Sequence, residues 1–306
     1  MRIGIFLGEA ADIDRQVRQV VEAEEDGFDS VWFGQIFAAD ALTTIALAGK
    51  ATERIELGTA VIPTYPRHPF VLAQQALTTQ AAAGGRLLLG IGLSHKPVVE
   101  GMWGLSYDKP ARHMREYLSV LRPLLNEGQV SFQGDVFRVA GGVQVPGATP
   151  PSLLIAALAP LMLRMAGELT DGTVTWMCGP KTIETHIAPR INAAASDAGR
   201  PAPRVCVGLP VAVTEDVAGA RASIGEMLTI YGQLENYRRV LDKERDAASP
   251  ADVAIVGDEA DVERQLRSLA SAGATDLLAS IFPVDGDADA SVARTQALLK
   301  GLVGKV

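Results

Sequence analysis

The sequence predicts an α/β fold, a (β/α)₈ TIM barrel that forms one domain over residues 1–306. Three observations support this prediction. Strand-like and helix-like segments alternate along the whole chain, eight of the segments are core strands, and several strands are continuous apolar runs, as in parallel strands buried on both faces. No linker divides the chain, and its length suits one barrel domain. An open, doubly wound parallel sheet is the alternative architecture.

The expected strands cover residues 3–7, 30–33, 55–62, 87–91, 153–157, 172–176, 204–213 and 276–282. The expected helices cover residues 12–26, 39–51, 69–83, 110–126, 160–169, 181–198, 215–245, 258–272 and 289–302. Apolar residues at helical spacing mark the helices, and Gly or Pro marks many of their ends. Short β-like pieces punctuated by Gly and Pro lie near residues 128–150, where we expect an inserted hairpin and loop.

The clearest βαβ unit begins with the apolar run at residues 55–62, which Pro63 closes. A helical pattern then begins at Pro69 and ends at Gly84-Gly85, with Pro and Gly at the positions that favour them. A second apolar run follows at residues 87–91. We therefore expect the carboxyl ends of these two strands to lie side by side.

Composition limits the classes of partner. The net charge is −8 without a basic run, which argues against nucleic acid. No apolar run is long enough to cross a bilayer, and we expect no secretory leader because Met1 leads directly into a strand. Cys178 and Cys206 have no metal-ligand spacing and form no disulfide framework, which is typical of reduced cytosolic thiols. We expect a cytoplasmic protein with a small-molecule substrate and no bound metal.

The predicted carboxyl ends of the strands carry few charged residues. The chain has no HExxH zinc motif, no GxSxG nucleophile motif and no phosphate-binding GxxxxGK[ST] loop. The apolar side chains expected at the barrel mouth are Ile36, Phe37, Trp103, Trp176 and Met177. Such a mouth suits a flat, largely apolar ring, and a cofactor that brings its own chemistry explains why no catalytic triad is visible.

Three stretches resemble the bacterial luciferase-like flavin and deazaflavin oxidoreductases. They are RIELGTAV…P…RHP…LAQQALTTQAAAGGRLLLGIG, ARHMREYLSVLRPLL and IAALAPLMLRMAGELTDGTVTW. The resemblance covers most of the first two thirds of the chain. Within the family, these stretches look most similar to the enzymes that use coenzyme F420, a deazaflavin. It implies a TIM barrel with an insertion, an isoalloxazine-type cofactor in the barrel mouth and a homodimer.

The resemblance also implies positions for the cofactor. A non-prolyl cis peptide at Ala60-Val61 would support the ring, and Leu93, Ser94 and His95 would contact its polar edge or the ribityl chain. The turn Ala157-Leu158-Ala159 would hold a phosphate on free helix N–H groups. The residues that would complete the phosphate pocket are Trp176, Met177, Cys178 and Gly179. For Ala60-Val61 the alternative is an ordinary strand end, and for the alanine turn it is a plain helix start.

Two departures from the family concern catalysis. Deazaflavin sugar-phosphate and alcohol dehydrogenases carry an Asp-His pair after the second strand, where this chain has Gln35-Ile36. Their proton-donating Glu after the fourth strand is replaced by His95, which could donate a proton or hydrogen-bond the cofactor. Gln35 and His95 are therefore the candidate catalytic residues. The candidate substrate contacts are Glu9, Ile36, Tyr65 and Trp103.

These features predict an F420-dependent oxidoreductase that transfers a hydride between the deazaflavin and a small organic substrate, as a reductase. One alternative is an FMN-dependent monooxygenase that uses reduced flavin and oxygen, and another is a non-catalytic flavin-binding protein. Among the other histidines, His68 is expected to cap the following helix. His186 is expected in mid-helix, far from any strand end.

Overall fold

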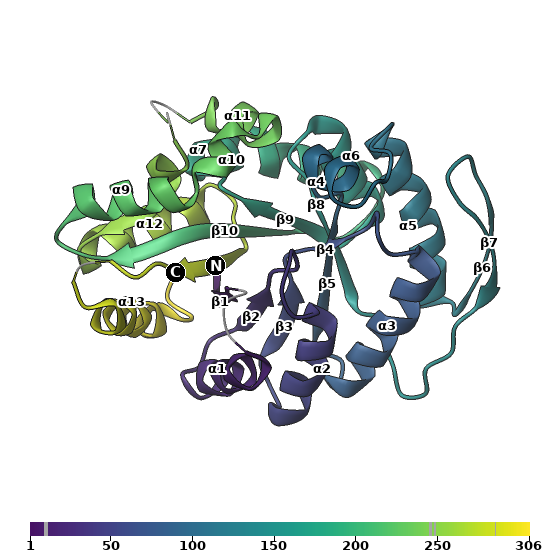
Figure 1. The fold of residues 1–306 in the computed structure, drawn as a ribbon, viewed down its shortest axis with the longest axis horizontal. Coiled ribbons are helices and arrows are strands. Elements are labelled where there is room, and N and C mark those ends of the chain that lie inside the picture. Colours follow the sequence, from purple (N-terminus) through teal and green to yellow (C-terminus); the bar gives the residue numbers. More distant parts are fainter. Residues whose placement is uncertain (9–11, 245–246, 248, 285) are drawn as a thin grey trace.

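The computed structural model describes residues 1–8, 12–244, 247, 249–284 and 286–306. Parallel strands form a closed barrel with helices around it (Figure 1). The strands of the ring are β1 (Arg2–Leu7), β2 (Ser30–Phe33), β3 (Glu56–Thr59), β5 (Leu87–Gly92), β8 (Ser152–Ala156), β9 (Gly172–Trp176), β10 (Arg204–Val213) and β12 (Asp276–Ile281).

Strand pairing closes the ring without an edge. Each strand pairs in parallel with the next strand of the ring, β10 pairs with both β9 and β12, and β12 pairs with β1. The register places Arg2 opposite Asp276, and Cys206 opposite Asp276 on the other side. The predicted (β/α)₈ barrel is therefore confirmed, and the doubly wound alternative is wrong.

The βαβ unit has the predicted arrangement, with one refinement. The predicted strand 55–62 is two pieces, β3 and β4 (Ile62–Pro63), and the chain turns between them at the cis peptide Ala60-Val61. Beyond this turn Ile62 pairs with Ile91, and Pro63 with Gly92, so the carboxyl ends of β4 and β5 lie side by side.

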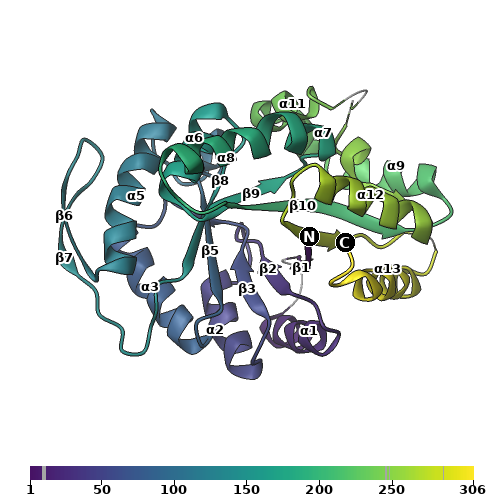
Figure 2. The same cartoon turned by 180° about the vertical axis from the view of Figure 1, so that it is seen from behind.

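Helices cover the outer face of the barrel (Figures 1 and 2). They are α1 (Ile13–Glu25), α2 (Ala41–Ala51), α3 (Pro69–Ala82), α5 (Pro110–Asn126), α6 (Pro160–Leu169), α7 (Pro180–Thr182) continued by a π-helical turn (Ile183–Ile187) and α8 (Ala188–Asp197), α12 (Glu259–Ser271) and α13 (Ala288–Leu302). Side-chain caps fix several helix starts. Asp12 accepts from Arg15 N, Asp40 from Thr43 N, and His68 from Phe70 N, as predicted for His68.

The predicted insertion near residues 128–150 is confirmed. β6 (Gln129–Gln133) and β7 (Arg138–Gly142) form an antiparallel hairpin that lies outside the barrel (Figure 1). The Glu116 carboxylate of α5 accepts hydrogen bonds from the backbone N–H groups of Val136 and Phe137, which anchors the hairpin turn on the barrel.

Three elements differ from the prediction. The expected helix 215–245 is divided into α9 (Val217–Met227), α10 (Thr229–Gln233) and α11 (Glu235–Leu241), and the backbone is extended at Leu234, between α10 and α11. A 3₁₀ turn (Pro250–Val253) and β11 (Ile255–Gly257), which pairs with β10, follow. The short helix α4 (Lys96–Gly101) begins directly after β5. The 3₁₀ turn, β11 and α4 are too short to show a periodic pattern in the sequence.

Apolar side chains fill the space between the barrel and its helices, and a smaller buried cluster around Trp32, Leu154 and Leu278 lies inside the ring. Two tight approaches need glycine: a Cβ on Gly58 would lie 2.2 Å from the Trp32 ring, and one on Gly90 would lie 2.0 Å from the Thr59 carbonyl oxygen. Within the described residues, no helix is both long and apolar enough to cross a membrane.

Candidate active site

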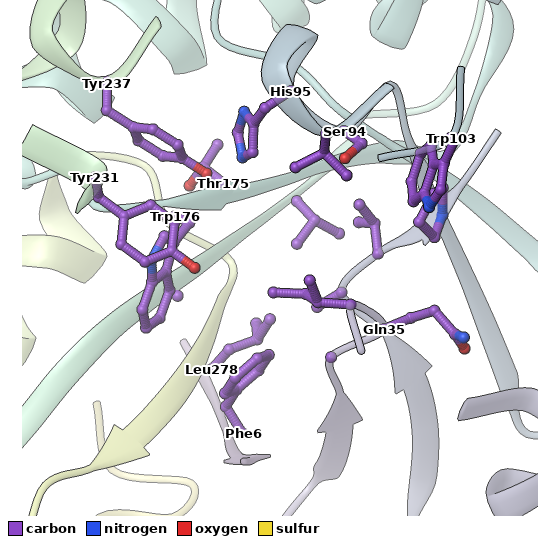
Figure 3. Close-up of a pocket in the computed structure, with 18 residues that line it drawn as sticks. Phe6, Gln35, Ser94, His95, Trp103, Thr175, Trp176, Tyr231, Tyr237 and Leu278 are labelled. Atoms are coloured by element: carbon purple, nitrogen blue, oxygen red, sulfur yellow. The ribbon is translucent and has the colours of Figure 1, made fainter. Parts of the chain in front are cut away.

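A cavity of about 390 Å³ opens at the carboxyl ends of the barrel strands. Barrels of this type place their sites at this end, and the volume lies toward the lower end of the range usual for ligand pockets. The residues that line it are Phe6, Gly34, Gln35, Ile36, Ala60, Val61, Pro63, Ser94, His95, Val98, Trp103, Val174, Thr175, Trp176, Gly208, Tyr231, Tyr237 and Leu278 (Figure 3).

The cis peptide at Ala60-Val61 forms one wall of the cavity. The Thr59 hydroxyl fixes this wall from behind, because it donates to the Gly90 carbonyl at 2.7 Å and accepts from the Gly90 N–H at 2.9 Å. A Cβ on Gly92 would lie 2.5 Å from Val61 Cγ2, so the wall packs directly on the backbone of β5. The cis bond implied by the family resemblance is present in the structure.

Ser94 and His95 come next, at the end of β5. Ser94 has a left-handed backbone with φ of 59°, and its carbonyl accepts from the Tyr107 hydroxyl at 3.3 Å. His95 then begins α4, and its own carbonyl accepts from the N–H groups of Val98 and Val99. Burial lowers the pKa of the His95 imidazole, so the ring is neutral at pH 7. A neutral ring can donate one hydrogen bond and accept another.

Aromatic rings form the wall beside His95. Tyr231 and Tyr237 come from α10 and α11, and their rings meet edge to face at 5.2 Å. Trp176, at the end of β9, contacts Tyr231 at 6.1 Å and Phe6 at 5.6 Å between ring centroids. Figure 3 shows these rings together on one side of the cavity, with Trp103 on the other. Sequence reasoning missed both tyrosines, because neither follows a barrel strand.

Gln35 lines the cavity, but its side-chain oxygen is already engaged. Gln35 Oε1 accepts a 2.7 Å hydrogen bond from the Ala41 N–H, at the start of α2. Its amide group lies toward Trp103 in Figure 3, on the far side of the cavity from the tyrosines. This arrangement makes Gln35 an anchor for the loop after β2. Ile36 also lines the cavity, with half of its surface exposed.

Several predicted cofactor residues do not line the cavity. Met177 and Cys178 are fully buried in the hydrophobic core, and burial together with Glu244 raises the pKa of the Cys178 thiol to about 12. Met177, like the exposed Phe37, was expected at the mouth, and neither residue is among the lining side chains. The other predicted residues outside the lining are Leu93, Ala157, Leu158, Ala159 and Gly179.

Gly179 lies beside an anionic side chain. The Glu244 carboxylate accepts from the backbone N–H groups of Thr182 at 2.7 Å and Lys181 at 3.3 Å, at the start of α7. A Cβ on Gly179 would meet the same carboxylate at 2.9 Å. A negative group therefore already satisfies these N–H donors. By contrast, the start of α6 after Ala159 has no side-chain cap among the described residues, and the family resemblance implies a phosphate there.

His186 lies next to this second helix start, contrary to the expectation that it is far from any strand end. Its Nε2 lies 2.7 Å from the carbonyl oxygen of Leu158, and the side chain is 6% exposed. The π-helical turn 183–187 places His186 on the side of the helix that faces the β8–α6 turn. No sequence pattern announces a π-helical turn, which is why the contact was not predicted.

The remaining candidates have varied positions. Tyr65 stacks on the His113 ring at 4.0 Å and on Tyr107 at 5.3 Å, outside the cavity lining. Its hydroxyl is buried without a hydrogen-bond partner among the described residues. Trp103 lines the cavity as predicted. Glu9 lies outside the residues that the structure describes.

The cavity is uncharged over the described part of its lining, which contains no Asp, Glu, Lys or Arg. Nor do the described residues group three or more His, Cys, Asp or Glu side chains as a metal site. An apolar, ring-lined cavity with a few hydroxyl, amide and imidazole groups fits a planar cofactor, whereas it offers no acid–base pair for chemistry of its own. The wall at Ala60-Val61 and the residues Ser94 and His95 would hold the ring.

Comparisons with known proteins show the family of this chain. The family model for luciferase-like monooxygenases matches residues 1–279. A Mycobacterium tuberculosis protein, provisionally named a coenzyme F420-dependent oxidoreductase, is 31% identical over 255 residues, which are 76% of this chain and 72% of the relative.

Two solved structures show the same fold. The coenzyme F420-dependent tetrahydromethanopterin reductase of Methanopyrus kandleri has a TM-score of 0.78 at 20% identity, over 100% of this chain and 98% of that one. The oxygenating constituent of 3,6-diketocamphane monooxygenase from Pseudomonas putida, in complex with FMN, has a TM-score of 0.76 at 18% identity, over 100% and 99%. The protein is an enzyme and an oxidoreductase by these relationships, and the chain belongs to the luciferase-like monooxygenase family.

Proposed function

We propose that this enzyme binds coenzyme F420 in the barrel mouth and acts as a reductase on a small organic substrate. The single observation that carries the proposal is the cavity at the carboxyl ends of the barrel strands, which is lined by aromatic rings and, among the described residues, by no charged side chain. A bound deazaflavin would supply a hydride to the substrate. The relative that is named for F420 use supports the choice of deazaflavin over FMN.

In this proposal the chain contributes binding, orientation and exclusion of water. The Ala60-Val61 wall supports the ring, and Ser94 and His95 offer hydrogen bonds to its polar edge. Because burial keeps the His95 imidazole neutral, His95 acts as a hydrogen-bond donor to the cofactor or substrate and can pass on a proton taken from solvent. Gln35 keeps the loop after β2 in place through its bond to Ala41.

The test is a parallel binding titration of the purified protein with F420 and FMN, followed by fluorescence. Tight F420 binding with weak FMN binding is the expected result. Preference for FMN would contradict the proposal and favour oxygen-dependent monooxygenation. Tight F420 binding without turnover across a screen of reducible substrates would favour a non-catalytic binding protein. A Val61→Asp variant, which places a charge on the wall, is expected to lose binding, and Val71→Asp on the exposed face of α3 is the matched control.

We also propose that the protein is a homodimer, as the family resemblance implies. Light scattering at several concentrations measures this directly, and a monomer at all of them would contradict it.

A further inference from the structure

The aromatic side of the cavity has a geometry suited to a planar guest. Trp176, Tyr231 and Tyr237 form a continuous series in which neighbouring rings meet at 66° and 88°. His95 continues the series, with its ring 5.7 Å from that of Tyr237. Rings that meet edge to face present both ring faces and ring edges to the space beside them, and both kinds of surface stabilise a further aromatic ring.

The same cavity disfavours an ionised guest. None of its described lining residues is Asp, Glu, Lys or Arg, and the neighbouring side chains of His95 and Tyr237 stay neutral at pH 7. Burial lowers the pKa of His95 and raises the pKa of Tyr237 well above its ordinary value. A carboxylate or ammonium group that enters such a site loses its hydration without gaining a counter-charge, which is strongly unfavourable.

The tyrosines belong to a segment outside the eight barrel units. α10 and α11 follow β10 and lie above the mouth of the barrel (Figure 1). This segment is held to the barrel by the Thr182 hydroxyl, which donates to the Val240 carbonyl at 3.0 Å, and by the Glu244 contacts at the start of α7. Tyr231 and Tyr237 are thus presented to the cavity from a fixed segment, independently of the wall at Ala60-Val61.

We propose that the substrate is an uncharged, planar, conjugated carbonyl compound that carries an aromatic ring, and that Tyr231 and Tyr237 determine this specificity. This inference rests on the proposed function. In the reaction the conjugated C=C bond takes a hydride at its β-carbon from the reduced cofactor and a proton from water at its α-carbon. Two electrons leave the cofactor, and the C=C bond becomes a single bond.

The experiment compares three probes by calorimetric binding to the cofactor-loaded protein, followed by turnover with reduced F420. The probes are benzylideneacetone, its ring-carboxylated analogue, and pentenone, which has the same enone without a ring. We expect benzylideneacetone to bind about tenfold more tightly than either of the others. Pentenone lacks one aromatic contact, and the carboxylated analogue brings one unpaired charge into a partly open site; each effect has about this size.

Variants separate specificity from general damage. Tyr237→Leu and Tyr231→Leu are each expected to weaken benzylideneacetone binding roughly 5- to 10-fold, while pentenone binding stays within about twofold. Tyr237→Phe keeps the ring and is expected to retain the preference. Circular dichroism and F420 affinity, measured on every variant, show whether the fold and the cofactor site are intact.

Each outcome decides between the two proposals. The substrate inference would be overturned if the carboxylated probe bound as tightly as benzylideneacetone or more tightly. It would also be overturned if the leucine variants lost as much affinity for pentenone as for benzylideneacetone. In both cases F420 binding would still support the proposed function. If F420 does not bind, the proposed function fails, and the three probes titrated into the unloaded protein still test whether the cavity prefers uncharged rings.

Discussion

The Nε2 atom of His186 lies 2.7 Å from the carbonyl oxygen of Leu158. This contact joins the π-helical turn between α7 and α8 to the turn that precedes α6. Because Leu158 is an acceptor, His186 donates from Nε2, which fixes the tautomer of the neutral ring. The contact holds the helix start at which the family resemblance implies a phosphate. His186 is therefore a positioning residue for that turn.

Replacing His186 by Phe is expected to weaken cofactor binding through its phosphate. An aromatic ring is kept, the hydrogen bond is lost, and the partly buried Leu158 carbonyl is left without this donor at a cost of about 1–3 kcal/mol. F420 affinity is expected to fall about tenfold, with no change for the phosphate-free deazariboflavin core of F420. His186→Gln, which can still donate an N–H, serves as the rescue variant. Equal losses for both ligands would show a general structural role.

Replacing Thr59 by Val is expected to loosen the cis peptide wall. The Thr59 hydroxyl is buried and bonds both the carbonyl and the N–H of Gly90. Val has nearly the same shape, so the variant removes two hydrogen bonds without a cavity, and we expect a loss of roughly 1–3 kcal/mol in the free energy of unfolding. Urea denaturation measures the loss and a flavin titration measures affinity.

Thr59→Ser is the matched control, because it keeps the hydroxyl and deletes only a methyl group. It is expected to recover most of the cofactor affinity. If the Thr59→Val variant binds the cofactor as tightly as the native chain does, the Thr59 hydroxyl does not hold the wall.

The regular part of the fold was predictable because its signals are local. Continuous apolar runs predict the barrel strands. The two ends of α3 are predicted within one or two residues by Pro69 and by Gly84-Gly85. The break at Leu234 has no such signal. Its extended backbone ends α10 and starts α11 at an ordinary residue, so the segment that carries Tyr231 and Tyr237 was predicted as one long helix.

The candidate site was predictable only where it follows the barrel strands. Ser94, His95 and Trp176 line the cavity as their places at the ends of strands indicate. Met177 and Cys178 also follow a strand, but φ of 58° at Met177 turns the chain so that both side chains enter the core. A single left-handed residue other than Gly cannot be recognised from sequence, and it decides which side chains face the ligand.

At the opposite end of the barrel, the buried Asp276 depends on Arg204. Arg204 is the first residue of β10 and bonds both Asp276, which is 1% exposed, and Glu56. Arg204→Met is expected to cost about 3–5 kcal/mol, because it removes the main partner of a buried carboxylate. Denaturant unfolding measures the cost, and cofactor affinity is expected to stay unchanged because these residues lie at the amino ends of their strands.

The double variant Arg204→Met with Asp276→Leu is the informative comparison. It removes both charges and is expected to be more stable than Arg204→Met alone. If the double variant is the less stable of the two, the unpaired Asp276 carboxylate is not the source of the loss.

The lowered pKa of the buried His113 makes the free energy of unfolding depend on pH. Burial lowers the pKa of His113 to about 4 from 6.5, against the opposing effect of Glu116. The unfolded chain therefore binds the proton first as the pH falls. The contribution of His113 is fully present above pH 6.5 and is lost as the pH falls toward 4. The loss between pH 6.5 and pH 5 amounts to roughly 2 kcal/mol.

His113→Phe tests this dependence, because it keeps a ring against Tyr65 and removes the titrating group. The variant loses the bond between His113 Nε2 and the Thr64 hydroxyl, so its stability at pH 8 is the reference for each protein. Urea unfolding at pH 8, 6 and 5 is expected to show a smaller decline for the variant than for the native chain. Lowered pKa values at His95 and His186 act in the same direction in both proteins, so they cancel in the difference. Parallel declines in the two proteins would show that folding does not lower the pKa of His113.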